Sequence, residues 1–233
     1  RLTAIMIPDS VTDIGDKAFY NTAYYNDESN WIDGVLYIGN HLIKAKYSVS
    51  GSYTIKAGTE CIADCAFNNC TVLTSITIPD SVTSIGRYAF RNSGLTSITI
   101  PDSVTRINDF AFSYSAYYNN ESNWVDGVLY IGNHLIKAKN SVSGSYTIKA
   151  GTKCIAGNAF WKCTDLTLIT IPGSVTSIVD SAFSACTGLT SVTICNGVTS
   201  IGRNAFSGCT GLTSVTIGNS VTSIGTAAFS GCK

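Results

Sequence analysis

The nine cysteines of this 233-residue chain are the residues that could most readily bind a metal or form disulfides. Cys61, Cys65 and Cys70 lie close enough in sequence to suggest a zinc site, because thiolates are favoured zinc ligands. A matching copy, residues 154–163, keeps the outer two thiols but has Asn158 in the middle, and no histidine lies near it in sequence. We therefore expect no metal site.

The cysteines also follow a sequence repeat. A free cysteine packs as a small apolar residue, and parallel Cβ vectors on stacked copies fit disulfide geometry poorly. We therefore expect reduced thiols in an interior ladder, with bridges between neighbouring copies as the alternative. Five cysteines share one repeat position: Cys70, Cys163, Cys186, Cys209 and Cys232.

Histidine and acidic residues offer little further chemistry. His41 and His134 are the same residue in two copies of one segment, and neither has a nucleophile and an acid spaced as in a triad, so we expect surface strand positions. The acidic run 26–30 could ligate calcium, but its copy at 119–123 has one carboxylate fewer, which favours a solvated loop. No Gly-rich loop joins a strand to a helix. The sequence predicts a protein that is not an enzyme and has no cofactor.

Eight copies of a unit about 23 residues long position these side chains. Each unit predicts a strand with alternate residues facing inward, a second short extended segment, and one tight turn at an Ala-Phe pair. We expect Gly86, Gly202 and Gly225 to turn the chain. The phenylalanines of the eight pairs are Phe19, Phe67, Phe90, Phe112, Phe160, Phe183, Phe206 and Phe229.

A second, longer sequence repeat contains several of these units. Residues 23–62 and 116–155 are identical at 36 of 40 positions, so a block has been duplicated. Its insert, at 22–52 and 115–145, contains two apolar runs separated by Gly39-Asn40 or Gly132-Asn133, which predicts a β-hairpin that projects from the sheet or widens it. Four hairpin aromatics either contact a partner or seal the hairpin to the repeats, and we favour sealing: Trp31, Trp124, Tyr37 and Tyr130.

No single unit can bury its apolar side alone, so stacking is required. The sequence predicts one β-rich, curved solenoid domain over residues 1–233, with parallel strands, short helical or 3-10 turns and two hairpin inserts. In this fold Phe183 belongs to a buried ladder.

The outward face of the repeat strands carries hydroxyl residues in register, which we call the hydroxyl strip. This strip either binds a protein or reflects the preference of threonine for exposed strands. Leu168 interrupts the serine row. The strip consists of Thr77, Thr99, Thr170, Thr193, Thr216, Ser75, Ser97, Ser191 and Ser214.

Charge and hydropathy restrict the partners. The chain has 15 basic and 15 acidic side chains, which argues against nucleic acid because phosphate binding needs a basic patch. No stretch approaches the roughly 20 apolar residues of a membrane span, so we expect no membrane insertion. The chain begins at Arg1 without a signal-peptide pattern, which suggests a mature form or a fragment. The last unit ends without a polar cap, so self-association through its sheet edge is a further expectation.

The repeat pattern L-x-x-I-x-I-P-x-x-V-x-x-I-G-x-x-A-F-x-x-C resembles the BspA-like, or Treponema pallidum-type, leucine-rich repeat family over essentially the whole chain. The resemblance implies a cell-surface or secreted protein, often an adhesin and virulence factor that binds host matrix proteins, plasma proteins or other cells. A structural spacer in a larger surface protein is the alternative. An ice-binding surface is a remote one, suggested by the regular threonines.

Overall fold

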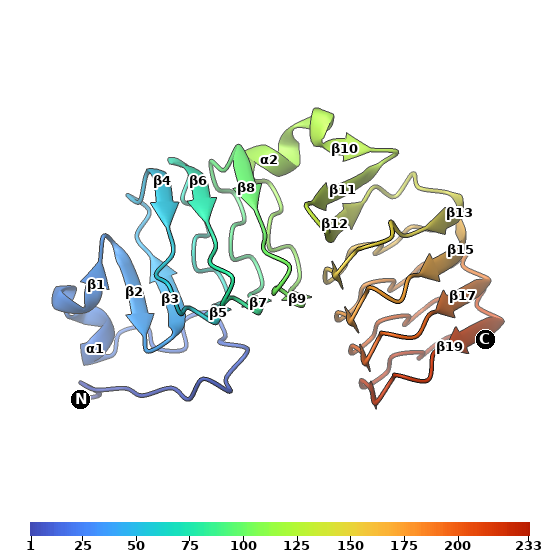
Figure 1. The fold of residues 1–233 in the computed structure, drawn as a ribbon. Coiled ribbons are helices and arrows are strands. Elements are labelled where there is room, and N and C mark those ends of the chain that lie inside the picture. The colour runs from blue at the N-terminus through green and yellow to red at the C-terminus, as the bar shows by residue number, and fades with distance from the viewer. The chain divides into compact units, whose positions relative to one another are not determined.

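The computed structural model describes all 233 residues as a β-solenoid fold of about eight turns with very little helix (Figure 1). Beyond the hairpins, each strand pairs in parallel with its counterpart in a neighbouring turn. The fold class predicted from the repeats is therefore confirmed. Helix α1 (Ala23–Asn26) and helix α2 (Ala116–Asn119) are single turns, and no helix has the length and apolarity to cross a membrane.

The chain divides into two compact units. Unit 1 contains residues 1–104 and 110–121, and unit 2 contains residues 105–109 and 122–233. Each unit has its own stack of repeats; unit 1 holds the first insert and residues 115–121 of the second, and unit 2 holds the rest of the second insert. The single domain over 1–233 stays a prediction.

The regular elements of the first half are short. They are α1, η1 (Glu28–Asn30), β1 (Trp31–Ile32), β2 (Val35–Ile38), β3 (His41–Ala45), β4 (Gly51–Thr54), β5 (Cys61–Ile62), β6 (Leu73–Thr77), β7 (Ser84–Ile85), β8 (Ser97–Thr99) and β9 (Arg106–Ile107).

The second half repeats this order. It contains α2, η2 (Glu121–Asn123), β10 (Trp124–Val125), β11 (Val128–Ile131), β12 (His134–Ala138), β13 (Gly144–Thr147), β14 (Cys154–Ile155), β15 (Leu166–Ile171), β16 (Ser177–Ile178), β17 (Ser191–Ile194), β18 (Ser200–Ile201), β19 (Ser214–Ile217) and β20 (Ser223–Ile224).

In unit 1 the repeat strands form two sheets. Strands β4, β6 and β8 make a parallel sheet, and β1, β2, β3, β5 and β7 follow one another in a second sheet. Strands β2 and β3 are the predicted hairpin, with Ile38 opposite His41 across the Gly39-Asn40 turn. Strand β3 then pairs in parallel with β5. The insert therefore widens the sheet, which confirms one of the two predicted placements.

The first repeat departs from the prediction, because residues 1–22 form no strand. The hairpin occupies the place beside β5 that a preceding repeat would fill. Residues of the first repeat instead pack their apolar side chains, including Ile5, Ile7 and Phe19, against a buried cluster that contains Leu36 and Ile38 of the hairpin.

Unit 2 has the same plan with more repeats. Strands β13, β15, β17 and β19 make one parallel sheet, and the second sheet runs in the order β10, β11, β12, β14, β16, β18, β20. Strand β9 belongs to this unit, and the carbonyl oxygen of Ile107 accepts a hydrogen bond from the Gly157 N–H at 2.9 Å.

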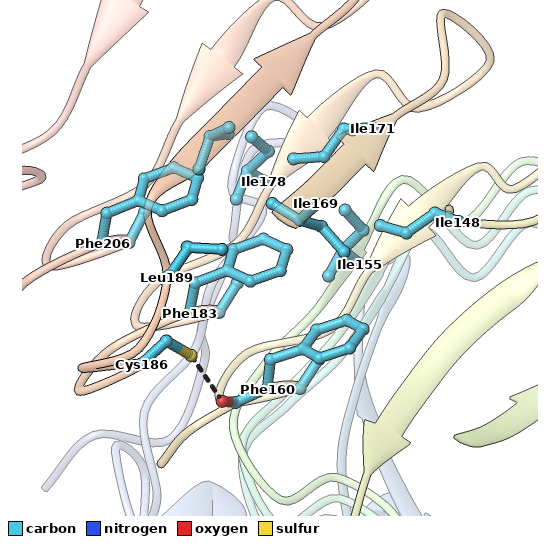
Figure 2. Close-up of a cluster of buried hydrophobic side chains, with 14 of the residues drawn as sticks. Ile148, Ile155, Phe160, Ile169, Ile171, Ile178, Phe183, Cys186, Leu189 and Phe206 are labelled. Carbon is cyan, nitrogen blue, oxygen red and sulfur yellow. Dashed lines mark hydrogen bonds between the residues drawn. The ribbon is translucent and has the colours of Figure 1, made fainter. Parts of the chain in front are cut away.

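Stacked phenylalanines form the centre of each core, as predicted. In unit 2 the ring of Phe183 lies 5.0 Å from those of Phe160 and Phe206, with nearly parallel planes (Figure 2). Phe229 continues the stack at 5.2 Å from Phe206. Tyr146 packs on the other end of this stack. In unit 1 the corresponding stack is Phe67, Phe90 and Phe112.

Six of the nine cysteines are buried, and all nine are unbridged. Figure 2 shows the thiol of Cys186 donating to the carbonyl oxygen of Phe160 one turn earlier, at 3.0 Å. Cys209 makes the same bond to Phe183 at 3.1 Å. The expected interior ladder of reduced thiols is therefore confirmed.

The glycines expected to turn the chain have a different role. Gly86, Gly202 and Gly225 do not have positive φ. They lie where two turns approach closely: a Cβ on Gly202 would come within 2.6 Å of the Asp180 nitrogen. The prediction that these glycines turn the chain was therefore wrong. Glycine is required here because there is no room for a Cβ.

The left-handed conformation occurs elsewhere in the repeat. The residue before each Ala-Phe pair has φ between 55° and 60° in all eight copies, and none of the eight is glycine. These residues are Lys17, Cys65, Tyr88, Phe110, Asn158, Ser181, Asn204 and Ala227.

Candidate functional site

The hydroxyl strip is present as two separate stretches, one in each unit. In unit 1, Ser75 pairs with Ser97 and Thr77 with Thr99 across β6 and β8. These four side chains line a shallow hollow of ≈ 310 Å³.

In unit 2 the longer stretch crosses β15, β17 and β19. Thr170, Thr193 and Thr216 pair in register. Ser191 pairs with Ser214, and Leu168, which is 44% exposed, takes the place of a serine beside them. The structure thus aligns the predicted residues within each unit.

Sequence reasoning missed the first row of each stretch. In unit 1, Ser52 pairs with Ser75 and Thr54 with Thr77. In unit 2, Thr147 pairs with Thr170. The signal was present in the two copies of YTIKAGT, whose strands align with the other repeats.

The strip hydroxyls differ from other threonine hydroxyls in their bonding. Thr190 donates to the Thr167 carbonyl oxygen one turn earlier at 3.0 Å, and Thr213 donates to that of Thr190 at 3.2 Å. Thr199 and Thr222 make equivalent bonds on another edge of the turn. None of the strip hydroxyls makes a hydrogen bond within the protein. They are therefore available to an external donor or acceptor.

The hairpin aromatics are used mainly in packing. Tyr37 is buried, and its hydroxyl lies 3.1 Å from that of Tyr53 and accepts from the Lys56 N–H. Trp31 is half-buried; its indole N–H donates to the Tyr25 carbonyl oxygen at 2.9 Å. These contacts support the interpretation that these side chains seal the hairpin.

The second hairpin repeats the arrangement. The hydroxyl of the half-buried Tyr130 lies 3.4 Å from that of Tyr146. The Lys139 ammonium lies 5.1 Å from the ring centre of the half-buried Trp124. Partner binding through Trp31 and Trp124 stays a prediction.

The histidines are not on the surface, which corrects the sequence expectation. His41 and His134 are fully buried. The Nε2 atom of His41 lies 3.0 Å from the Val11 carbonyl oxygen, because residues of the first repeat cover the start of β3. Because both side chains are fully buried, packing explains these histidines without a role in partner contact.

The acidic run has local partners. The Asp27 carboxylate accepts hydrogen bonds from the Ser29 N–H at 3.0 Å and hydroxyl at 2.7 Å, which caps η1 and lowers the pKa of Asp27. Glu28 forms an ion pair with Lys46. Both carboxylates therefore stabilise the loop conformation.

Comparison with known proteins agrees with the repeat geometry. The family model described as the BspA type leucine rich repeat region matches residues 1–119, 37–143 and 118–233, with six copies. No curated protein sequence matches the chain.

Several solved structures are similar. A leucine rich cell surface protein from Faecalibacterium prausnitzii is 29% identical with a TM-score of 0.40, and the match covers 99% of this chain and 76% of that one. The T. pallidum leucine rich repeat protein is 23% identical with a TM-score of 0.38, covering 82% and 80%. The pneumococcal vaccine antigen PcpA is 21% identical with a TM-score of 0.38, covering 99% and 67%.

The matched ranges of the family model together span the whole chain, and the structure has the parallel strands and stacked phenylalanines of a repeat solenoid. This chain belongs to the BspA-type leucine-rich repeat family.

Proposed function

We propose that this chain is an extracellular or cell-surface protein-binding module, an adhesin or part of one, without enzymatic activity. Its partners would be host matrix or plasma proteins, or proteins on other cells. Membership of a repeat family of bacterial surface proteins supports protein binding and surface location.

The observation that carries the proposal is the bonding of the hydroxyl strip. Neighbouring threonine rows donate to the preceding turn, whereas the strip hydroxyls donate to no protein acceptor. They stand in parallel, in-register rows on strands whose backbone is held by the sheet. Such a rigid surface loses little conformational entropy on binding, and repeated weak contacts add up through avidity.

The test is label-free binding of the purified chain to a panel of matrix and plasma proteins. Thr193→Lys with Thr216→Lys places two long charged side chains on the unit 2 stretch, and Thr77→Lys with Thr99→Lys does the same in unit 1. We expect saturable binding by the unchanged protein and a loss of at least about tenfold in affinity in one pair, because interface affinity concentrates in a few contacts.

Thr199→Lys with Thr222→Lys is the matched control, since these exposed threonines lie outside the strip. It should keep the binding. If the folded chain binds nothing saturably, or if the control pair loses binding as strongly, the proposal is wrong, and a spacer role explains the first of these results.

A further inference from the structure

A pocket of ≈ 200 Å³ in unit 1 lies outside the hydroxyl strip. It is formed between the turn of the first repeat, helix α1, and the end of β3. Ile43 is the one buried residue of its lining, and Phe19 beside it is half-buried. A concave space lined by apolar and aromatic side chains together with a few polar groups has the composition of a small-molecule site, and this volume suits a ligand of about one ring.

Three tyrosines line the pocket. Tyr20 and Tyr47 are 53% and 63% exposed, so both rings are accessible to a ligand. Tyr25 packs edge-on against Tyr20, with ring centres 5.3 Å apart, and against Trp31 at 5.2 Å. Tyr25 is thus held in place from both sides. Exposed ring faces beside a fixed ring can stack on a ligand that presents C–H groups.

The charged groups at the pocket balance one another. Asp16 and Asp64 supply two carboxylates, and Lys17 and Lys44 supply two ammonium groups. The Lys44 ammonium already donates to the Cys65 carbonyl oxygen at 2.6 Å. With no excess of either sign, the pocket favours a neutral ligand that has several hydrogen-bonding groups.

The tyrosine hydroxyl is a neutral donor here. Burial, followed by the nearby Tyr20, Tyr47 and Asp16, raises the pKa of Tyr25. All four of these residues line the same pocket. The pocket lining therefore combines carboxylate acceptors, tyrosine hydroxyl donors and aromatic rings.

We propose that this pocket binds a neutral sugar residue at the end or within a glycan chain. The C–H face of a pyranose ring would stack on the tyrosines, and its hydroxyls would donate to Asp16 and Asp64. This goes beyond protein binding by the hydroxyl strip, and the two activities can fail separately.

The duplicated block shows that the fold does not require these side chains. At positions 93 residues later, Tyr20 is replaced by Ser113, Tyr47 by Asn140 and Asp64 by Gly157. Tyr47 and Asn140 are one of only four differences across the 40 matched positions of the two blocks. The first block alone carries all three tyrosines of the pocket.

The experiment is saturation-transfer NMR and calorimetry of the whole chain. The probes are methyl glucoside, methyl galactoside, methyl mannoside and N-acetylglucosamine, with glycine and lysine as zwitterionic and cationic probes. Tyr20→Ser with Tyr47→Asn introduces the residues that the second block tolerates. We expect saturable binding of at least one sugar, and about tenfold or weaker affinity in this variant, because two aromatic contacts are lost.

Trp161→Ser, which removes an exposed aromatic in unit 2, is the matched control and should bind as the unchanged chain does. The proposal is overturned if no sugar binds the folded protein, if the double tyrosine variant binds equally well, or if only glycine or lysine binds. An equal loss of sugar binding in Trp161→Ser and in the double tyrosine variant would also overturn the proposal.

Discussion

Each buried thiol of the cysteine ladder holds its turn against the one before it. The sulfur of Cys186 donates to the Phe160 carbonyl oxygen, that of Cys209 to Phe183, and that of Cys232 to Phe206. Cysteine suits this position because it is small, packs as an apolar residue and still offers a weak donor. The same carbonyl oxygens also accept a backbone bond, such as that from the Cys163 N–H to Phe160 at 3.0 Å, so the thiol is a second donor to each of them.

The thiol of Cys154 should make stability depend on pH. Burial raises its pKa from 9.0 to about 12, so the folded state keeps the proton after the unfolded chain has lost it. This stabilisation is complete below pH 9 and is lost as pH rises toward 12, by about 1.4 kcal/mol per pH unit. Chemical denaturation of the protein and of Cys154→Ala, at several pH values, measures the effect.

The comparison between the two proteins isolates the thiol from other groups that titrate in this range. The gap in unfolding free energy between them should narrow as pH rises above 9. A gap that stays constant to pH 11 would contradict the assignment to Cys154.

At the scale of the repeat element, the close approach of neighbouring turns at Gly202 can be tested by substitution. A Cβ on Gly202 would lie 2.6 Å from the Asp180 nitrogen and 2.8 Å from the Val179 carbonyl carbon. Val179 occupies the equivalent position one turn earlier, and its backbone nitrogen lies 3.4 Å from the Ile155 carbonyl oxygen. The backbone nitrogen of Gly202 lies closer, at 2.8 Å from the Ile178 carbonyl oxygen. We expect Gly202→Ala to lower the unfolding free energy by about 1–3 kcal/mol, through overpacking.

Gly15 provides the matched control for this substitution. It occupies the same repeat position, but a Cβ there meets nothing within 4 Å. Denaturant titration of Gly15→Ala should show little change from the unchanged protein. Equal losses in both variants would mean that backbone flexibility, and not the close approach, explains these glycines.

At the scale of the whole molecule, the two cores should respond separately to core damage. Phe183 is fully buried between Phe160 and Phe206, so Phe183→Ala should cost about 3–5 kcal/mol. In a solenoid each turn contacts only its neighbours. Hydrogen exchange should therefore rise in unit 2 around the phenylalanine stack and stay unchanged around Phe90 in unit 1.

The reciprocal variant completes this test. Phe90→Ala should raise exchange around Phe67 and Phe112 and leave unit 2 protected. If either variant raised exchange equally in both units, or cost less than about 1 kcal/mol, the description of two separate phenylalanine cores would be wrong.

Much of this fold follows from the repeats because identical residues must stack. The phenylalanine and cysteine ladders, the register of the threonine rows and the Gly39-Asn40 hairpin could all be predicted. The missing strand in residues 1–22 and the burial of His41 could not. Both arise from contacts between the hairpin and the first repeat, which no local pattern encodes.

The hydroxyl strip and the pocket of unit 1 also differ in how far the sequence predicts them. The strip was predictable because its residues recur at one repeat position. The pocket was not, since Tyr20, Tyr25 and Tyr47 come from a repeat, a helix and a loop that only the folded chain brings together. The sequence also could not predict that Thr190 and Thr193 differ in hydrogen bonding, because both are threonines in one repeat.

The left-handed residue before each Ala-Phe pair has a consequence for how such a protein can change. Its backbone conformation is the same whether the side chain is Lys17, Phe110, Ser181 or Ala227. The backbone geometry there accepts side chains of very different size and polarity, although none of the eight is β-branched or proline, which positive φ disfavours. Randomising these eight positions together would give a combinatorial library on a constant scaffold, and repeat duplication in evolution offers the same freedom to diversify a surface one turn at a time.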